Sequence, residues 1–438
     1  MIELFDFQKK ILDDTQEFNR CAYYLDMGLG KTFVGSEKLI NLRKGVNLIV
    51  CQKSKVKDWT EHFQTNYLLP VHDLTVKAEF EEFVEMIKTG HSIIGVINYD
   101  LLIRRPELKK LKDFALMLDE SQAIQNETAK RTKYIMKMNP SAVILLSGTP
   151  VNGKYEQLYS QCQLLGWNIS KKDFWDRYIV YRLWRPVPMM PPIKLVSGYK
   201  NVEELKRNLR NYGAVFLKTD EVMTLPDQLF CTVNVSTSPQ YRQFMKNRIV
   251  NVDGEWKSYV DECGHDIEYY TGKTLVGDTL LTKLLYARQL CSIYNKDKLG
   301  AFKDWIESTN ERLIVFYNFT EELNRMLTVI GDRPVSIVNG EQRDLTAYEN
   351  EPNSITFLQI QSGNSGLNLQ KANHMAFFSL PLSCNMFEQA KKRIHRIGQK
   401  QTCFYYYFMC MDSVEEDILA ALKRGKDYTD KLFTECEK

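Results

Sequence analysis

The chain has 438 residues, 44% of them hydrophobic and 26% charged, which predicts two or three globular domains with ordinary cores. No apolar run approaches the roughly 20 residues of a membrane span, and the first residues lack a signal-peptide pattern, so we expect a cytoplasmic protein without membrane contact. Ten cysteines without a Cys-x-x-Cys pair predict reduced thiols and no structural zinc. The net charge of +3 does not itself demand a nucleic-acid partner, although basic residues cluster at 53–57, 104–112, 206–210 and 391–400.

The first 150 residues alternate between helix-like and short apolar segments. Residues 1–20 and about 32–42 are predicted to be helical, and residues 55–65 and 79–88 also have patterns typical of helices. The predicted strands are 21–25, 47–51, 92–98, 114–119 and 142–146. Short apolar strands separated by helices are typical of a parallel α/β sheet covered on both faces.

A glycine-rich stretch, Met27-Gly28-Leu29-Gly30-Lys31-Thr32, joins the first predicted strand to a predicted helix. Glycines let backbone N–H groups turn onto a phosphate, the lysine reaches the terminal phosphates, and the threonine hydroxyl ligates Mg²⁺. The strict pattern requires a glycine at position 25, where the chain has Leu25. A second string, Thr271-Gly272-Lys273-Thr274, is equally imperfect, but it lies in a polar stretch without the strand and helix that the first string has.

Two adjacent carboxylates, Asp119 and Glu120, follow a buried apolar strand. By itself such a pair is more typical of a solvated helix start. At the carboxyl end of a strand in a parallel sheet, we expect Asp119 to hold Mg²⁺ and Glu120 to orient or deprotonate an attacking water. The next strand ends similarly in Ser147-Gly148-Thr149-Pro150, which places two hydroxyls at the same edge.

The pattern changes after residue 155. Helices at Tyr155–Leu165, Lys171–Trp184 and Val202–Tyr212 around a proline-rich loop, Pro186–Pro192, predict an all-helical protrusion. Residues 226–300 are mixed, with an extended piece at Gln228–Val235, helices from Pro239 and at about 279–293, and a polar hairpin-like insert at 250–278.

A second α/β pattern begins near residue 301. Its predicted strands are Leu313–Tyr317, Val335–Val338, Ile355–Ile360, His374–Ser379 and Cys403–Met409, followed by a last helix from Val414. The aromatic run Phe404–Phe408 fits either a base-stacking platform or, as its place in the alternation favours, a buried strand.

These motifs, in this order, resemble the Swi/Snf-type ATPases, the branch of superfamily II helicases that translocates on double-stranded DNA. In the first half, five segments resemble family motifs in order. They are Met27–Thr32 for motif I, Ile49–Ser54 with Trp59 for motif Ia, Asn98-Tyr99 for motif Ib, Asp119–Asn126 for motif II, and Leu145–Pro150 for motif III. In the second half, Leu313–Phe316 resembles motif IV and Ser362–Leu369 motif V. The most specific string is Gln389–Gln399, which resembles motif VI.

The resemblance implies an α/β fold of two RecA-like lobes with helical protrusions and an ATP site in the cleft between them. We expect lobe 1 at 1–225 with the protrusion at about 155–215, a linker and helical insertion at 226–300, and lobe 2 with the last helix at 301–438. The resemblance also implies ATP and Mg²⁺ as cofactors, and it implies that Gln8 recognises the adenine base. Arg393 and Arg396, three apart and so on one face if helical, would stabilise charge on the γ-phosphoryl group.

The same resemblance implies that DNA is the partner, double-stranded and bound without sequence preference. The implied DNA-contacting residues are Lys53, Ser54, Asn98, Tyr99, Ser362, Asn364 and Ser365. We expect a monomer in isolation, with replication proteins as further partners.

The chain departs from the family pattern in two places. Gln122 replaces a commoner histidine in motif II, and Leu382-Ser383-Cys384 stands where many members have Trp-Asn-Pro. We expect the bare motor, without histone-reading modules, similar to bacteriophage and bacterial members with a role in replication or recombination. The expected activity is DNA-dependent ATP hydrolysis with translocation and remodelling.

Two alternatives remain. A strand-separating helicase would need a pin, for which only the 250–278 insert is a candidate. A nucleotide-switched assembly or loading factor would not need the intact Glu120, Arg393 and Arg396.

Overall fold

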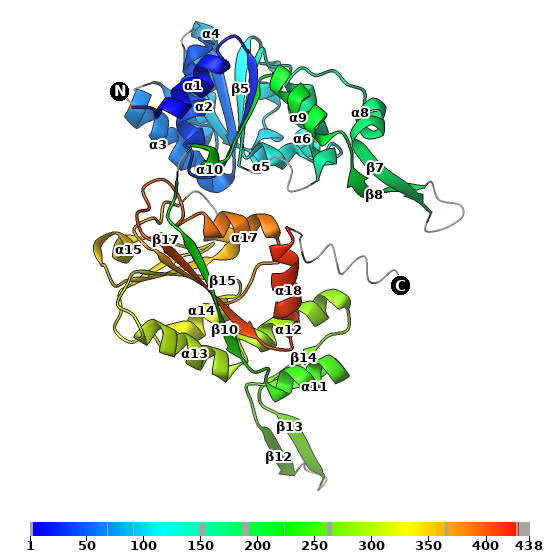
Figure 1. Ribbon diagram of the computed structural model, residues 1–438, viewed down its shortest axis with the longest axis vertical. Helices are drawn as coiled ribbons and strands as arrows, with labels where there is room; N and C mark the ends of the chain where they lie inside the picture. Colours follow the sequence, from blue (N-terminus) through cyan, green and yellow to red (C-terminus); the bar gives the residue numbers. More distant parts are fainter. Residues whose placement is uncertain are drawn as a thin grey trace. The chain divides into compact units, whose positions relative to one another are not determined.

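The computed structural model describes residues 3–67, 69–90, 92–148, 154–185, 192–222, 224–260, 265–363, 367–425 and 428. The chain divides into two compact units, Met1–Thr224 and Leu225–Lys438. Each unit is built around one seven-stranded sheet (Figure 1). The prediction of an α/β protein with two parallel-sheet domains is therefore confirmed.

The sheet of the first unit has the strand order β3-β4-β2-β5-β6-β1-β9, and all its pairs are parallel. Its strands are β1 Arg20–Leu25, β2 Val46–Cys51, β3 Val71–Asp73, β4 Ile93–Asn98, β5 Phe114–Asp119, β6 Ala142–Ser147 and β9 Ala214–Leu217. The longer strands are continuously buried, as their unbroken apolar runs require for a sheet covered on both faces.

Helices cover both faces of this sheet. They are α1 Asp6–Asp14, α2 Lys31–Asn41, α3 Val56–Tyr67, α4 Lys77–Thr89, α5 Tyr99–Leu102, α6 Lys130–Ile135, α7 Tyr159–Leu164, α8 Lys171–Tyr178, α9 Val202–Asn211 and α10 Thr219–Val222. Helix α2 lies directly on β5 and β6, because a Cβ on its Gly35 would come within 2.9 Å of Leu146 and 3.1 Å of Met117. On the other face, α4, α5, α6 and α9 share one apolar cluster with β1 and β5.

The sheet of the second unit has the order β10-β20-β19-β15-β18-β16-β17, parallel except for the β16–β17 pair. Its strands are β10 Gln228–Val235, β15 Leu313–Tyr317, β16 Val335–Val338, β17 Arg343–Asp344, β18 Ile355–Gln359, β19 His374–Phe377 and β20 Cys403–Cys410. Strand β20 contains the aromatic run, and its alternate tyrosines Tyr405 and Tyr407 are buried in the core. The run is thus a core strand.

The helices of the second unit pack on both faces of its sheet. They are α11 Pro239–Asn247, α12 Leu280–Ser292, α13 Lys296–Glu307, α14 Thr320–Leu327, α15 Thr346–Asn350, α16 Ile360–Gly363, α17 Cys384–Lys391 and α18 Val414–Lys423. Helices α12, α17 and α18 share one apolar cluster, and α13 and α14 belong to the other. Among the described residues, no helix combines the length and apolarity needed to cross a membrane.

The predicted all-helical protrusion is wrong in one part. Helix α8 ends at Tyr178, and the rest of the predicted helix Lys171–Trp184 is strand β7, Ile179–Trp184, paired antiparallel with β8, Ile193–Tyr199. The β-branched and aromatic residues Ile179, Val180 and Tyr181 favour a strand once a partner strand is available. Most of the proline-rich loop lies outside the described residues.

The prediction of a linker and helical insertion at 226–300 also needs correction. Strand β10 is a full member of the second sheet, since all eight of its residues pair with β20. The insert contains two antiparallel strand pairs, one nested within the other: β11 Ile249–Val252 pairs with β14 Lys273–Val276, and between them β12 Trp256–Val260 pairs with β13 Asp266–Tyr270. Helices α11 and α12 flank them in the chain.

The second Lys-Thr string is part of this insert. A strand, β14, begins at Lys273, so the string lacks the helix N-terminus that a phosphate loop needs. Gly272 lies against the other strand of the hairpin, where an added Cβ would lie 2.3 Å from the carbonyl oxygen of Val252. The glycine is explained by close strand approach.

Candidate functional site

The glycine-rich stretch joins the carboxyl end of β1 to the start of α2. Gly28 and Gly30 have φ angles of 92° and 73°, in the left-handed region that favours glycine. The Lys31 ammonium donates hydrogen bonds to the carbonyl oxygens of Leu25 and Asp26 at 3.0 and 3.3 Å. The loop thus presents a lysine at the N-terminus of an 11-residue helix, where the helix dipole favours an anion.

Gln8 braces this loop from α1. Its side chain is buried, with Nε2 donating to the carbonyl oxygen of Leu29 at 3.0 Å and Oε1 accepting from the backbone N–H of Phe5 at 3.0 Å. A Cβ at Gly30 would lie 2.3 Å from Gln8 Nε2, so only glycine fits there while Gln8 keeps its place. The structure brings Gln8 to the phosphate loop, and its predicted contact with adenine stays a prediction.

The two predicted catalytic carboxylates lie at the same sheet edge as the loop, because β5, β6 and β1 are neighbours. Asp119 Oδ2 accepts a 2.9 Å hydrogen bond from Trp59 Nε1, and Oδ1 accepts one from the Glu120 N–H at 3.0 Å. Burial, and then the charge of Glu120, raise the pKa of Asp119 to about 6. The Trp59 bond and the charges of Lys55 and Lys31 act in the opposite direction.

Glu120 is connected to the end of the neighbouring strand through Gln122. The backbone of Glu120 is in the left-handed region, with a φ of 51°. Gln122 Nε2 donates to Glu120 Oε2 at 2.7 Å, and Gln122 Oε1 accepts from the Ser147 hydroxyl at 2.8 Å. An amide can make both bonds because one end donates and the other accepts. The residue that departs from the family pattern therefore links motif II to motif III.

The donor set at this edge fits Mg²⁺. Thr32 supplies a hydroxyl in the first turn of α2, and Asp119 supplies a carboxylate at the end of β5. Mg²⁺ prefers such oxygen ligands, completed by water and phosphate oxygens. Lys31, the glycine turn and the α2 N-terminus supply positive charge for phosphates.

Arg393 and Arg396 lie in the second unit and are not on a helix, which corrects the prediction that they share a helical face. Helix α17 ends at Lys391, and the chain continues in turns to Gly398, whose φ is 95°. The two arginines still converge, because each donates from Nη1 to the carbonyl oxygen of Leu367 at 3.4 Å. A shared backbone acceptor replaces the expected helical spacing.

Comparison with known families covers nearly all of the chain. Residues 15–294 match the SNF2-related domain, and residues 297–398 match the helicase conserved C-terminal domain. The chain belongs to the SNF2-related family. It thus carries the two domains of an SNF2-type ATP hydrolase, as the order of its motifs predicted.

Its relatives in this family are distant and longer. YwqA of Bacillus subtilis (strain 168) is 23% identical over 451 residues, which cover 93% of this chain and 46% of YwqA. The SWI/SNF-related matrix-associated actin-dependent regulator of chromatin subfamily A-like protein 1 of Xenopus tropicalis is 24% identical, covering 89% of this chain and 41% of that protein. DNA repair and recombination protein RAD54B of Gallus gallus is 23% identical, with coverages of 90% and 49%. The chain spans less than half the length of these relatives.

Among solved structures, the Sulfolobus solfataricus SWI2/SNF2 ATPase core in complex with dsDNA is similar to this SNF2-related chain. The sequence identity is 19% and the TM-score 0.45, with 97% of this chain and 91% of that chain covered.

The predicted DNA-contacting residues have different surroundings. Lys53 and Ser54 are exposed in a short 3₁₀ turn, Lys53–Lys55, directly after β2. Asn98 and Tyr99 are buried, and the Tyr99 hydroxyl donates to the carbonyl oxygen of Asp119 at 2.8 Å. Tyr99 therefore supports the end of β5, and its phenol is not exposed to DNA. Asn364, Ser365 and the side chain of Ser362 lie outside the described residues, as do Thr149 and Pro150.

Sequence reasoning missed three residues of this SNF2-related site. The motif pattern includes Trp59 only as part of motif Ia, predicts a DNA contact for Tyr99, and marks Gln122 only as a departure from the family pattern. The signal for Gln122 was present, since an amide near a predicted catalytic carboxylate needs partners at both ends. Nothing in the spacing relates Trp59 to Asp119, because their contact is made across 60 residues.

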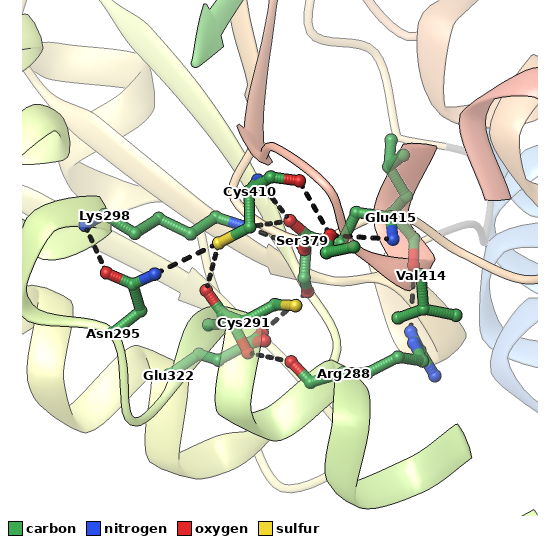
Figure 2. A network of polar contacts seen from close by, with 12 residues as sticks. Arg288, Cys291, Asn295, Lys298, Glu322, Ser379, Cys410, Val414 and Glu415 are labelled. Carbon is green, nitrogen blue, oxygen red and sulfur yellow. Dashed lines mark hydrogen bonds and ion pairs between the residues drawn. The ribbon is translucent and has the colours of Figure 1, made fainter. Parts of the chain in front are cut away.

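A buried polar network orders the turn that follows β19 in the second unit (Figure 2). The Ser379 hydroxyl donates to Glu322 Oε2 at 2.9 Å, and Arg288 Nη2 donates to the carbonyl oxygen of Leu380 at 2.8 Å. The network thereby fixes the start of the Ser379–Ser383 segment that precedes motif VI.

The same network contains Cys291, Cys410 and Glu415, whose ligand atoms lie within 4.8 Å of one another. Both Glu415 oxygens accept from Lys298 Nζ, at 2.7 and 2.9 Å, in a fully buried ion pair. Burial raises the pKa of the Cys291 thiol well above its ordinary value. A protonated thiol and a carboxylate already paired with an ammonium do not suit a cation, so we assign this cluster to packing of α12, α13 and β20.

Proposed function

We propose that this SNF2-related chain is a DNA-dependent ATPase that translocates on double-stranded DNA and remodels DNA or protein–DNA complexes. A role in phage or bacterial DNA replication or recombination, in the cytoplasm, is part of the proposal. The observation that carries it is the meeting of the phosphate loop, Asp119–Glu120 and Ser147 at the carboxyl edge of three neighbouring strands. That edge is where parallel sheets bind ligands.

The proposed hydrolysis assigns each group one task. Lys31 and the N-terminus of α2 stabilise the phosphates. Thr32 and Asp119 would hold Mg²⁺, which would supply positive charge for the phosphate oxygens. Glu120, held by Gln122, orients or deprotonates the attacking water. Arg393 and Arg396 of the second domain supply positive charge to the transferred phosphoryl group.

The proposed DNA contacts are to phosphates. Lys53 and Ser54 are exposed beside the catalytic edge, at the end of β2, where they could donate to a backbone. Contacts of this kind carry no base information, so binding is expected to be sequence-independent and to weaken with salt.

The test is ATP turnover with and without duplex DNA, in the parent chain and in Lys31→Ala. Stimulation by duplex and loss of turnover in Lys31→Ala support the proposal, whereas unstimulated turnover or an active Lys31→Ala variant contradicts it. Displacement of a triplex-forming strand then measures translocation.

Two other outputs remain distinguishable by experiment. A strand-separating helicase would unwind forked DNA, whereas displacement of a triplex-forming strand without unwinding would exclude this function. The candidate separation pin is the β12–β13 hairpin. A nucleotide-switched loading factor would turn over ATP too slowly for stepping. The bonds that hold Glu120 in place favour hydrolysis over a passive switch.

A further inference from the structure

The hairpin formed by β7 and β8 projects past α8 in the first unit (Figure 1). Its strands pair with each other from Ile179–Tyr199 to Trp184–Ile193 and are not part of the seven-stranded sheet. Its base packs on the core of the first unit through Ile179 and Tyr181, whereas Trp184 and Ile193 at its far end are exposed. Exposed apolar side chains at the end of a two-stranded ribbon offer a surface for a binding partner.

This hairpin is strongly basic. Residues 179–200 contain Arg182, Arg185, Lys194 and Lys200 and no Asp or Glu, a charge of +4 compared with +3 for the whole chain. Within the part of the chain that the structure describes, none of these four cations forms an ion pair. Lys194 instead lies over the rings of Tyr181 and Trp175, at 4.1 and 5.0 Å.

Apolar side chains accompany the cations. Val180, Arg182 and Trp184 alternate along β7 and so share one face, with Ile193 directly opposite Trp184. Trp184 and Ile193 are 37% and 49% exposed, which is unusual for side chains of their size. Cations interleaved with an exposed aromatic ring are the groups that bind phosphates and stack on sugars or bases.

The β12–β13 hairpin of the second unit is shorter, with five residues in each strand, and has the opposite charge. Its Trp256 is 63% exposed, so exposed aromatic residues are common to both hairpins. Residues 253–270 contain six acidic residues and a single lysine, Lys257. An acidic surface repels DNA, which argues against this hairpin as a strand-separating pin and makes it a control for the first hairpin.

We propose that the β7–β8 hairpin is an additional nucleic-acid contact that binds the phosphate backbone through Arg182 and Arg185, and through Lys194 on the opposite face, where it pairs with Leu183. Trp184 packs on the sugars or bases beside the bound phosphates. The ligand is the polyphosphate backbone, from either a duplex or a single strand. The inference rests on the proposed function only in taking DNA as the natural partner.

The experiment uses the full chain and fluorescence anisotropy with labelled duplex and single-stranded DNA of equal length, over a range of salt. In the variant Arg182→Ala/Arg185→Ala/Lys194→Ala, the slope of log affinity against log salt should fall by about 2.7 on duplex, or about 2.1 on single strands, at roughly 0.9 or 0.7 for each lost phosphate contact. A smaller salt slope with weaker affinity on either DNA supports the proposal. The DNA that shows the change identifies whether a duplex or a single strand supplies the phosphate backbone. An unchanged slope and affinity on both would overturn it.

Matched single variants separate a contact from general electrostatics. Arg182→Ala should weaken binding and Lys257→Ala should not, while Trp184→Ala should weaken it and Trp256→Ala should not. Equal losses for both hairpins contradict the proposal. Thermal unfolding and ATP turnover without DNA should match the parent in every variant. If DNA does not stimulate ATP turnover by the parent chain, but the β7–β8 variants still bind DNA more weakly than the parent, the proposed function fails and this inference stands.

Discussion

The indole nitrogen of Trp59, on α3, donates a 2.9 Å hydrogen bond to Oδ2 of Asp119, at the end of β5. Trp59 is 3% exposed, so its side of the bond is shielded from water. It fixes one carboxylate oxygen and leaves the orientation of the carboxyl group little freedom, which couples the motif Ia helix to the proposed metal ligand.

Trp59→Phe should raise the Mg²⁺ concentration needed for half-maximal ATP turnover by about tenfold, since a hydrogen bond to a charged group is worth about 1.5–3 kcal/mol. The measurement is steady-state turnover against Mg²⁺. Phe63→Leu is the control. Phe63 stacks on Trp59, with ring centroids 6.0 Å apart, but its apolar ring cannot donate a hydrogen bond to Asp119. A similar Mg²⁺ shift in both variants would attribute the effect to packing.

Gln122→Ala should lower turnover by about tenfold, because Glu120 loses the 2.7 Å bond that positions it. Ser147→Ala should have a smaller effect in the same direction. The double variant should be no slower than Gln122→Ala, as expected when two residues act through one chain of bonds. Additive losses would show that Ser147 acts independently of Gln122.

Arg396→Ala should reduce kcat by about a thousandfold while ATP binding changes little, as expected for an arginine that stabilises charge in the transition state. Lys400→Ala, an exposed cation four residues further on, should keep the parent kcat. Weaker nucleotide binding with an unchanged kcat would instead assign Arg396 to ground-state binding.

Lys298→Met should destabilise the second unit by about 3–5 kcal/mol, because it leaves the buried Glu415 carboxylate without its partner. Urea unfolding followed by Trp305 fluorescence measures this, since Trp305 lies on α13 with Lys298. Adding Glu415→Leu should recover much of the loss. Lys303→Met, which breaks an exposed pair with Glu307 on the same helix, should cost less than about 1 kcal/mol.

Much of the fold could be predicted from short apolar runs. The predicted bounds of Leu313–Tyr317 and Val335–Val338 are those of β15 and β16. The β15 run is buried throughout, and the β16 run alternates between buried and partly buried residues, and each pattern is typical of a strand. The short strands β3 and β9 were missed. Each has only three or four residues and exists because a neighbouring strand accepts it. Strand β7 was assigned to a helix because its partner, β8, begins nine residues beyond its end.

The site was predictable to the extent that its residues are adjacent in sequence. The loop from Met27 to Thr32 and the pair Asp119–Glu120 each have a local pattern whose chemistry is evident. The bonds of Trp59 and Tyr99 to Asp119 depend on how α3 and α5 pack at the end of β5, and the bond between Gln122 and Ser147 depends on how β5 and β6 pair. No local pattern in the sequence records these long-range contacts. The burial of Tyr99 likewise depends on tertiary packing.

The pairing of β10 with β20 has a mechanical consequence. The second unit begins at Leu225, and β10 starts at Gln228, so any tension arriving along the chain from the first unit enters this strand almost at once. Its eight residues pair in parallel register with β20, so the load is applied in shear along all eight pairs together. The force would therefore pass from β10 to β20, which is the strand that follows Arg393 and Arg396 in the chain.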